Sequence, residues 1–330
     1  MSDGRSRAGG ELKLVTGEFD RALALLRALG LRLDLIYPAD DPHTAVLVHG
    51  DGTVRLTSQP DAPVPLAELP AFQPDFVVSL AGGSANAGRA GMQYRDCIPG
   101  RLGGRYIASH ITIADGGPVS DWVHYHRVAF QMICVRTGWV RVVYEDQGEP
   151  FVMRPGDMVL QPPGIRHRVL ESSPGLEVVE VSSPALHETF ADHAMVLPNK
   201  RNDPERDFGG QRFLHHVSAD MPWTQWRGAQ AQETGMKAAT DGLADVRTLR
   251  PGEASEMAFQ PHDGELLFGF VMAGSAHLSC GESHRLGPAD AFVIPPGESW
   301  RLVEPSADFR LLHVATATAS QPLSNPGVFL

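Results

Sequence analysis

The chain has 330 residues, of which 42% are hydrophobic and 20% charged, and it carries a formal net charge of −11 at pH 7. A net negative charge argues against binding to nucleic acid, because contacts with phosphate need clustered Lys and Arg. No apolar run in the sequence is long enough to span a bilayer, and the polar start up to Glu11 lacks the apolar core of a signal peptide. We therefore expect a cytoplasmic protein without nucleic-acid or membrane partners. The length suits two or three domains, and 34 Gly with 26 Pro favour many short strands.

Residues 1–80 are predicted to form a small α/β module. A helix is expected over residues 19–29, where apolar side chains recur every three or four positions and Gly30 follows as a stop. The expected strands cover residues 12–15, 31–36, 44–49 and 53–57. This β-α-β-β-β order resembles one module of the glyoxalase-like vicinal-oxygen-chelate fold. Its first strand carries no His, Gln or Glu at an inward position, so we expect a structural or dimerising role without metal ligands.

Two stretches of small or polar residues divide the remainder of the chain. Residues 81–92 and 199–210 are predicted to be linkers by their composition. They delimit a domain over residues 93–198 and a second domain over residues 211–316. Residues 317–330 are predicted to be a C-terminal tail.

The motif His124-Tyr125-His126 is the strongest indication of a functional site. Successive side chains of a β-strand alternate between its faces, so both imidazoles point to the same side. Gln131 lies in the next strand-like run, and His167 follows the turn at residues 162–164. Because neutral imidazole is the commonest protein ligand of metals, we predict a divalent metal site here.

The spacing of these residues resembles the two consensus motifs of the cupin superfamily. The first motif, G-x5-H-x-H-x3,4-E-x6-G, is matched by His124, His126 and Gly138, with Gln131 in place of Glu and Gly117 one residue early. The second, G-x5-P-x-G-x2-H-x3-N, is matched by Gly156, Pro162, Gly164 and His167, with Glu171 in place of Asn. The resemblance implies a jelly-roll barrel that holds one divalent metal on the three histidines. Gln131 would either bind the metal through its amide oxygen or orient a metal-bound water.

Residues 211–316 repeat the pattern of the preceding domain. Gly274 stands where Gly138 does, and Pro295-Pro296-Gly297 repeats the turn at residues 162–164. The positions of His124, His126, Gln131 and His167 are taken by Gln260, His262, Leu267 and Trp300. Three of four ligand positions are lost, although Glu265 is close to His262. The chain therefore resembles a bicupin: mainly β, with two jelly-roll barrels in tandem, one of them degenerate, after the small N-terminal α/β module. The degenerate barrel is expected to complete a pseudo-symmetric interface.

Further side chains are candidates for roles beside the metal. We predict catalytic roles for Tyr106, His110 and Tyr144, with His110 as an acid/base or an extra ligand. A packed core histidine is the structural alternative for His110, and alternation does not decide whether Tyr144 or Glu145 points inward. The predicted substrate-binding residues, which could clamp a carboxylate, are Arg95, Arg101 and Arg105. A solvated loop explains these arginines equally well.

The resemblance allows more than one chemistry. Neutral ligands leave a charge of about +2 on the metal, which attracts an anionic or enolisable oxygen substrate. We predict an Fe(II) oxygenase of the dioxygenase type, acting on a small oxygen-rich or aromatic metabolite. The alternative is a non-redox cyclase, isomerase or lyase that uses Zn(II) or Ni(II), and Mn(II) is also compatible with the site. A small-molecule-binding sensor is the third hypothesis, without an apparent helix-turn-helix segment to support it. A homodimer is a further expectation.

Overall fold

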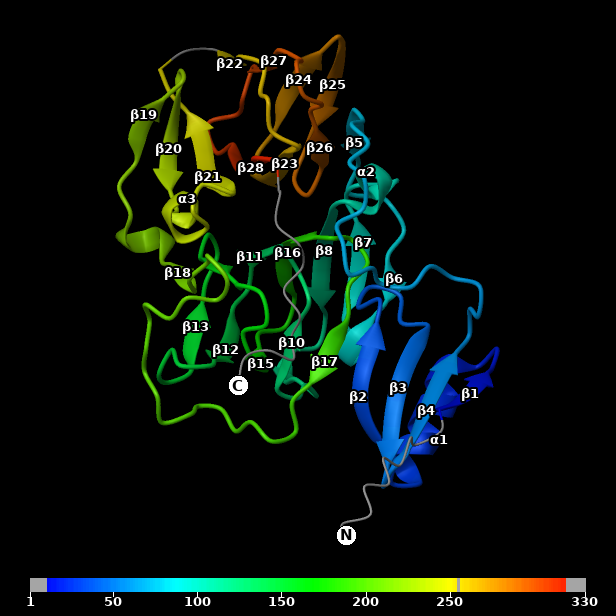
Figure 1. Ribbon diagram of the computed structural model, residues 1–330. Helices are drawn as coiled ribbons and strands as arrows, with labels where there is room; N and C mark the ends of the chain where they lie inside the picture. The colour runs from blue at the N-terminus through cyan, green and yellow to red at the C-terminus, as the bar shows by residue number, and fades with distance from the viewer. Residues whose placement is uncertain (1–10, 254–255, 319–330) are drawn as a thin grey trace.

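The computed structural model describes residues 11–253 and 256–318. The polar start before Glu11 and most of the predicted tail, residues 319–330, lie outside these ranges. The fold is mainly β: a small N-terminal α/β module (blue in Figure 1) is followed by two jelly-roll barrels, the first mostly green and the second yellow to red. None of the described helices is long and apolar enough to cross a bilayer.

The N-terminal module contains the expected helix and strands. Its elements are β1 (Glu11–Val15), α1 (Phe19–Ala28), β2 (Arg32–Tyr37), β3 (Thr44–His49) and β4 (Gly52–Thr57). Helix α1 ends where Gly30 adopts a positive φ of 91°, which a residue without a Cβ accommodates readily. Phe19, Leu23 and Leu26 share one face of α1 because they are spaced three and four residues apart. That face packs on Leu47 and Leu56 of the sheet.

The module is hydrogen-bonded into the sheet that carries the histidine motif. The sheet runs in the order β1-β4-β3-β2-β17-β10-β15-β12-β13, with β9 paired to β15. Ile36 of β2 pairs with Thr189 of β17 (Thr189–Ala191), and Thr189 in turn pairs with His126 of β10 (His124–His126). The N-terminal module therefore extends the first barrel and is not an independent body beside it (Figure 1).

The first barrel is closed by a second sheet with the order β18-β14-β11-β16-β8-β7-β6. Its remaining strands are β6 (Asn86–Ala87), β7 (Gln93–Asp96), β8 (Ile107–Ile113), β9 (Gly117–Pro118), β11 (Phe130–Thr137), β12 (Val140–Tyr144), β13 (Phe151–Met153), β14 (Met158–Leu160), β15 (His167–Ser172), β16 (Leu176–Ser183) and β18 (Leu214–His216). Two short helical turns, η1 (Arg89–Gly91) and α2 (Arg101–Gly104), lie beside β7 in sequence. Residues 81–92, predicted to be a linker, thus contain β6 and η1.

The second barrel has the sheets β19-β20-β21-β28-β23-β26-β5 and β22-β27-β24-β25. Its strands are β19 (Thr224–Trp226), β20 (Ala229–Glu233), β21 (Ala244–Pro251), β22 (Glu256–Phe259), β23 (Leu266–Ala273), β24 (Ala276–Cys280), β25 (Glu282–Leu286), β26 (Ala291–Val293), β27 (Trp300–Val303) and β28 (Arg310–Thr316), and its short helices are η2 (Ser218–Asp220) and α3 (Met236–Ala239).

Each barrel also receives a strand from outside its predicted boundaries. Residues 77–79, which the sequence placed in the N-terminal module, form β5 (Val77–Ser79) and pair with β26 of the second barrel. Residues 214–216, placed in the second domain, form β18 and pair with β14 of the first barrel. The boundaries at residues 80 and 211 were wrong in this respect, because short edge strands can pair with a neighbouring barrel without changing the local sequence pattern.

A shared apolar core joins the two barrels. Strands β11 and β16 carry apolar side chains on both faces: Val135 and Val178 point into the first barrel, while Met132 and Val181 point toward the second. Phe268 and Phe270 of β23 meet them from the other side. Both faces of these strands are therefore largely covered, and apolar residues stand on both sides of each strand instead of alternating strictly with polar ones.

Candidate metal centre

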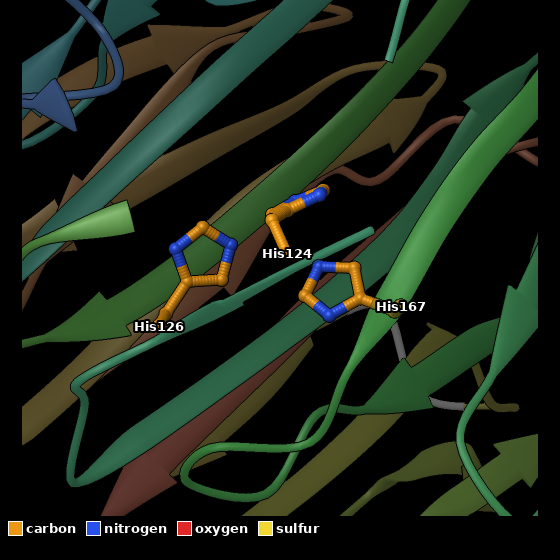
Figure 2. Close-up of side chains that lie close together, drawn as sticks. All are labelled: His124, His126 and His167. Carbon is orange, nitrogen blue, oxygen red and sulfur yellow. The ribbon is translucent and has the colours of Figure 1, made fainter. Parts of the chain in front are cut away.

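Three buried histidines meet inside the first barrel, as the sequence predicted. His124 and His126 point to the same side of β10, and His167 is the cross-strand partner of His124 on β15. Figure 2 shows the three rings turned toward one another, and one nitrogen of each lies within 4.8 Å of the others. The ring centroids of His124 and His167 are 4.2 Å apart. Alternation along β10 and pairing with β15 thus assemble the cluster.

The second nitrogen of each ring fixes its orientation. His124 Nδ1 donates to the carbonyl oxygen of Trp122 at 2.8 Å, and His167 Nδ1 donates to that of Ile165 at 3.0 Å. Because a carbonyl only accepts, Nδ1 carries the proton and Nε2 keeps its lone pair. His126 Nδ1 lies 3.2 Å from Thr189 Oγ1 on β17. Such partners of the second nitrogen are typical of histidines that bind metals.

Burial keeps these imidazoles neutral. It lowers the pKa of His124 and His126 well below the usual value, and it lowers the pKa of His167 to about 4. At neutral pH the cluster therefore offers three uncharged nitrogen donors in an enclosed space. This donor set fits a divalent transition metal that accepts imidazole ligands.

Two glutamines adjoin the cluster. Gln131 on β11 lies inside the barrel, and its Oε1 accepts a hydrogen bond of 3.0 Å from Gln161 Nε2. The same Gln161 nitrogen lies 3.5 Å from His167 Nε2. Gln161, which the sequence analysis did not select, thus contacts both Gln131 and His167. The amide oxygen of Gln131 accepts this hydrogen bond with one of its two lone pairs.

Tyr144 belongs to the same group. Its hydroxyl donates to Gln161 Oε1 at 2.6 Å, and its ring stacks on His167 with centroids 5.4 Å apart. Burial raises the pKa of Tyr144 above its usual value, so the hydroxyl keeps its proton at neutral pH. Of the pair Tyr144 and Glu145, the tyrosine therefore points inward, and Glu145 binds Arg206.

A cavity of about 70 Å³ adjoins the three histidines. Most of its wall is apolar, with Ile111, Ile133, Val142 and Val178 among the lining residues. The polar groups that line it besides the histidines are Arg89, Tyr94, Tyr144, Gln161 and Glu180. An apolar wall with a few converging polar groups is typical of a small-molecule site.

Arg89 and Glu180 are the charged groups of this wall. Arg89 is 8% exposed; its Nη1 donates to Asp121 Oδ1 at 2.5 Å and its Nη2 to His124 Nε2 at 3.0 Å. Burial opposes its charge, but Asp121, with smaller effects of Tyr94 and Glu180, raises the pKa of Arg89 above its usual value. Glu180 on β16 accepts a hydrogen bond of 3.2 Å from Ser182 Oγ. It is the one carboxylate among the described residues that line the cavity.

Two of the predicted catalytic residues lie between the barrels instead. His110 Nε2 is 2.7 Å from Glu177 Oε2, and the ring packs on Phe270 of the second barrel. Burial lowers the pKa of His110 below its usual value despite the nearby Glu177. The Tyr106 hydroxyl contacts Glu265 at 3.0 Å. Neither lines the cavity, because β8 turns Ile111 and Ile113 toward it and the alternate side chains toward the second barrel.

The three predicted substrate-binding arginines are also outside the cavity. Each donates hydrogen bonds to a carbonyl or carboxylate of another segment of the chain and so connects the two segments. Arg95 donates to Ala289 O at 2.5 Å, Arg101 to Asp40 Oδ2 at 2.6 Å, and Arg105 to both oxygens of Glu265 at 2.8 Å each. The arginine that does reach the cavity, Arg89, comes from the segment predicted to be a linker. Only its position in a Gly-rich stretch could have drawn attention to it.

The second barrel has no equivalent cluster among the residues the structure describes. Gly297 N donates to His262 O at 3.0 Å as Gly164 N donates to His126 O at 3.2 Å, so His262 matches His126 as predicted. The counterpart of His124, however, is Phe259, because Phe259 pairs with Trp300 as His124 pairs with His167. The predicted equivalence of Gln260 was wrong by one residue. Pro261 follows, and a residue without an N–H interrupts the strand there.

Comparisons with known proteins agree with this architecture. No curated protein sequence matches the chain. Among solved structures, protein Ylba from E. coli (family DUF861) is 10% identical, with a TM-score of 0.54, over 79% of this chain and 96% of that one. A single-residue variant of oxalate decarboxylase from B. subtilis is 10% identical, with a TM-score of 0.54, over 77% and 80%. A mutant salicylate 1,2-dioxygenase from Pseudoaminobacter salicylatoxidans is 14% identical, with a TM-score of 0.53, over 75% and 85%.

These similarities establish a shared fold. The family model described as Cupin domain matches residues 109–181. That segment contains His124, His126 and His167 together with Gln131, Tyr144, Gln161 and Glu180. The three histidines of the candidate metal centre therefore lie within the segment that matches the cupin model.

Proposed function

We propose that the protein is a bicupin metalloenzyme with one working centre, in which His124, His126 and His167 hold a single divalent metal. The observation that supports this most strongly is the convergence of three neutral imidazole nitrogens on an enclosed apolar cavity. We infer that the reaction is an Fe(II)-dependent oxygenation of a small oxygen-rich or aromatic anion. Iron bound there would supply the redox chemistry with O₂, whereas Zn(II) or Ni(II) would supply Lewis-acid chemistry alone.

The residues of the cavity have distinct tasks in this proposal. The apolar wall excludes bulk water and admits a small substrate, given a volume of about 70 Å³. Arg89 supplies positive charge for an anionic group. Gln161 is held by Tyr144 and Gln131 and can orient a substrate oxygen beside His167. The carboxylate of Glu180 accepts the proton that a substrate hydroxyl or an acidic C–H gives up.

A non-redox cyclase, isomerase or lyase is the second candidate, and Glu180 is the observation that favours it. Proton transfer next to a Lewis acid needs a base in the same cavity, and Glu180 offers a carboxylate there. Both candidates place the same residues around the substrate. They differ in the metal and in the consumption of O₂.

Metal analysis of anaerobically purified protein, followed by oxygen-uptake assays, separates the two. Protein reconstituted with Fe(II) or with Zn(II) is supplied with small hydroxy acids and hydroxylated aromatic acids. The oxygenase predicts substrate-dependent O₂ uptake with iron only. Full zinc occupancy, together with no O₂ uptake after iron reconstitution, would contradict the oxygenase and leave the non-redox reaction. Protein that binds neither metal would contradict both.

A further inference from the structure

The guanidinium of Arg89 occupies the lone pair that the metal would need. Its Nη2 lies 3.0 Å from His124 Nε2, and that nitrogen is an acceptor because His124 Nδ1 donates to Trp122 O. One lone pair cannot serve a guanidinium and a metal ion at the same time. In addition, the positive charge of Arg89 repels a divalent cation at this distance. The contact between Arg89 and His124 therefore disfavours metal binding at this nitrogen.

The same arginine has an incomplete set of hydrogen bonds. Its Nε is buried and has no partner, while Nη1 is used by Asp121. Nε and Nη2 form the edge of a guanidinium that binds a carboxylate with two parallel hydrogen bonds. Arg105 uses this edge to bind Glu265, and Arg127 uses it to bind Glu188. In Arg89 this edge has no carboxylate partner, and Arg89 is one of the residues that line the cavity.

The position of Arg89 is built into the fold. Its backbone N–H donates to Ala39 O of the N-terminal module at 3.0 Å, and its guanidinium lies over the Trp122 ring at 5.4 Å. The preceding Gly88 passes so close to Tyr94 that a Cβ would come within 2.4 Å of the tyrosine ring. The chain is thereby held where Arg89 enters the barrel. These contacts place the guanidinium beside both Asp121 and His124.

We propose that Arg89 couples metal binding to the binding of a small carboxylate. Without an anion, Arg89 holds Nε2 of His124 and weakens metal binding. A carboxylate in the cavity takes the Nε and Nη2 edge of Arg89, releases His124 and compensates the positive charge. Metal and carboxylate then bind with positive cooperativity. This inference rests on the proposed metal centre, and it assigns the substrate of that centre to the small carboxylates.

The test measures Zn(II) affinity of metal-free protein by calorimetry, with acetate, with acetamide or with neither, at an ionic strength kept constant with chloride. Acetate should raise the affinity of the wild type by roughly 5- to 150-fold, the range of typical coupled sites, and acetamide should not. Acetate binding to free Zn(II) acts in the opposite direction and cannot mimic the gain. Zn(II) binding that acetate leaves unchanged would overturn the coupling but keep the metal centre.

The variant Arg89→Gln removes the charge and the carboxylate edge. It should bind Zn(II) more tightly than the wild type without acetate, and it should lose the gain from acetate. A gain of the same size in the variant would overturn the proposal, because acetate would then act through the metal alone.

The variant Arg89→Lys keeps the positive charge but lacks the two-donor edge. Its Zn(II) binding without acetate should stay weak, and acetate should raise its Zn(II) affinity less than in the wild type. This result does not depend on whether Arg89→Gln folds. Arg136→Gln, whose arginine pairs with Glu177 outside the cavity, is the matched control and should behave as the wild type. Protein that binds no Zn(II) under any condition would overturn this proposal and the proposed function together.

Discussion

Phe259 and Trp300 face each other across β22 and β27, with ring centroids 3.9 Å apart. They occupy the place that the paired His124 and His167 take in the first barrel. His313 and Trp226 add further rings to this stack. The interior of the second barrel is therefore filled by aromatic packing, and we expect one metal per chain.

The single-site expectation is tested by two histidine variants. His167→Ala removes one of three converging nitrogens and should abolish metal binding. His262→Ala should leave metal content unchanged, because His262 Nε2 donates to Ile294 O and His262 belongs to no group of three or more potential ligands among the residues that the structure describes. Metal analysis of both purified proteins gives the answer. Equal loss of metal in the two variants would show that the second barrel also contributes a site.

The proposed role of Glu180 has a matched control on the same strand. Glu180→Gln removes the only carboxylate of the described cavity wall and should lower kcat by about 10²- to 10⁴-fold, with metal content unchanged. Glu177→Gln alters a carboxylate that binds Arg136 and His110 outside the cavity, and kcat should stay near that of the wild type. The kcat of both variants is measured by steady-state kinetics, on the substrate found by oxygen uptake or on a substrate of the non-redox reaction. A wild-type kcat in Glu180→Gln would remove Glu180 from the mechanism.

The bidentate pair of Arg105 and Glu265 predicts a stability effect. Both side chains are buried, so Arg105→Ala leaves Glu265 without its charge partner, although the Tyr106 hydroxyl still donates to it, and should lower the free energy of unfolding by about 3–5 kcal/mol. Denaturant unfolding measures this change. The double variant Arg105→Met with Glu265→Leu should regain much of the loss, because no charge remains buried without a partner. A higher KM with unchanged stability would instead support the substrate-binding role predicted for Arg105.

His313 predicts how stability depends on pH. Burial lowers its pKa from 6.5 to about 4, so the unfolded chain takes up a proton between these values before the folded chain does. The folded state should therefore lose stability as pH falls from about 6.5 to about 4, by about 3 kcal/mol from this residue alone. His313→Phe keeps a ring against Trp300 and removes the titration. Unfolding curves at pH 7 and pH 4.5 should show a smaller acid loss in the variant, and an equal loss in both proteins would exclude His313 as a cause.

The sequence predicted those parts of the site that depend on local spacing. Alternation within the motif at residues 124–126 places two imidazoles on one face, and the turn at residues 162–164 brings in His167. Alternation does not show which face of a strand points into the barrel. That depends on which other elements pack against each face, and the sequence of the strand alone does not show this. His110 shows this: β8 is buried on both faces because the second barrel covers one of them. Arg89 could not be predicted, since η1 is no strand and only contact with Ala39 and Trp122 directs it inward.

The shared sheet has a practical meaning for anyone who wishes to isolate the metal-bearing half. Cutting the chain before residue 81 would leave β17 as a bare edge beside β10, and such edges promote aggregation. The same cut would remove the Ala39 carbonyl to which Arg89 is anchored. The centre therefore cannot be excised as a free-standing minimal barrel. A chimaera of two related proteins would have to take the first eighty residues and the histidine-bearing barrel from the same parent.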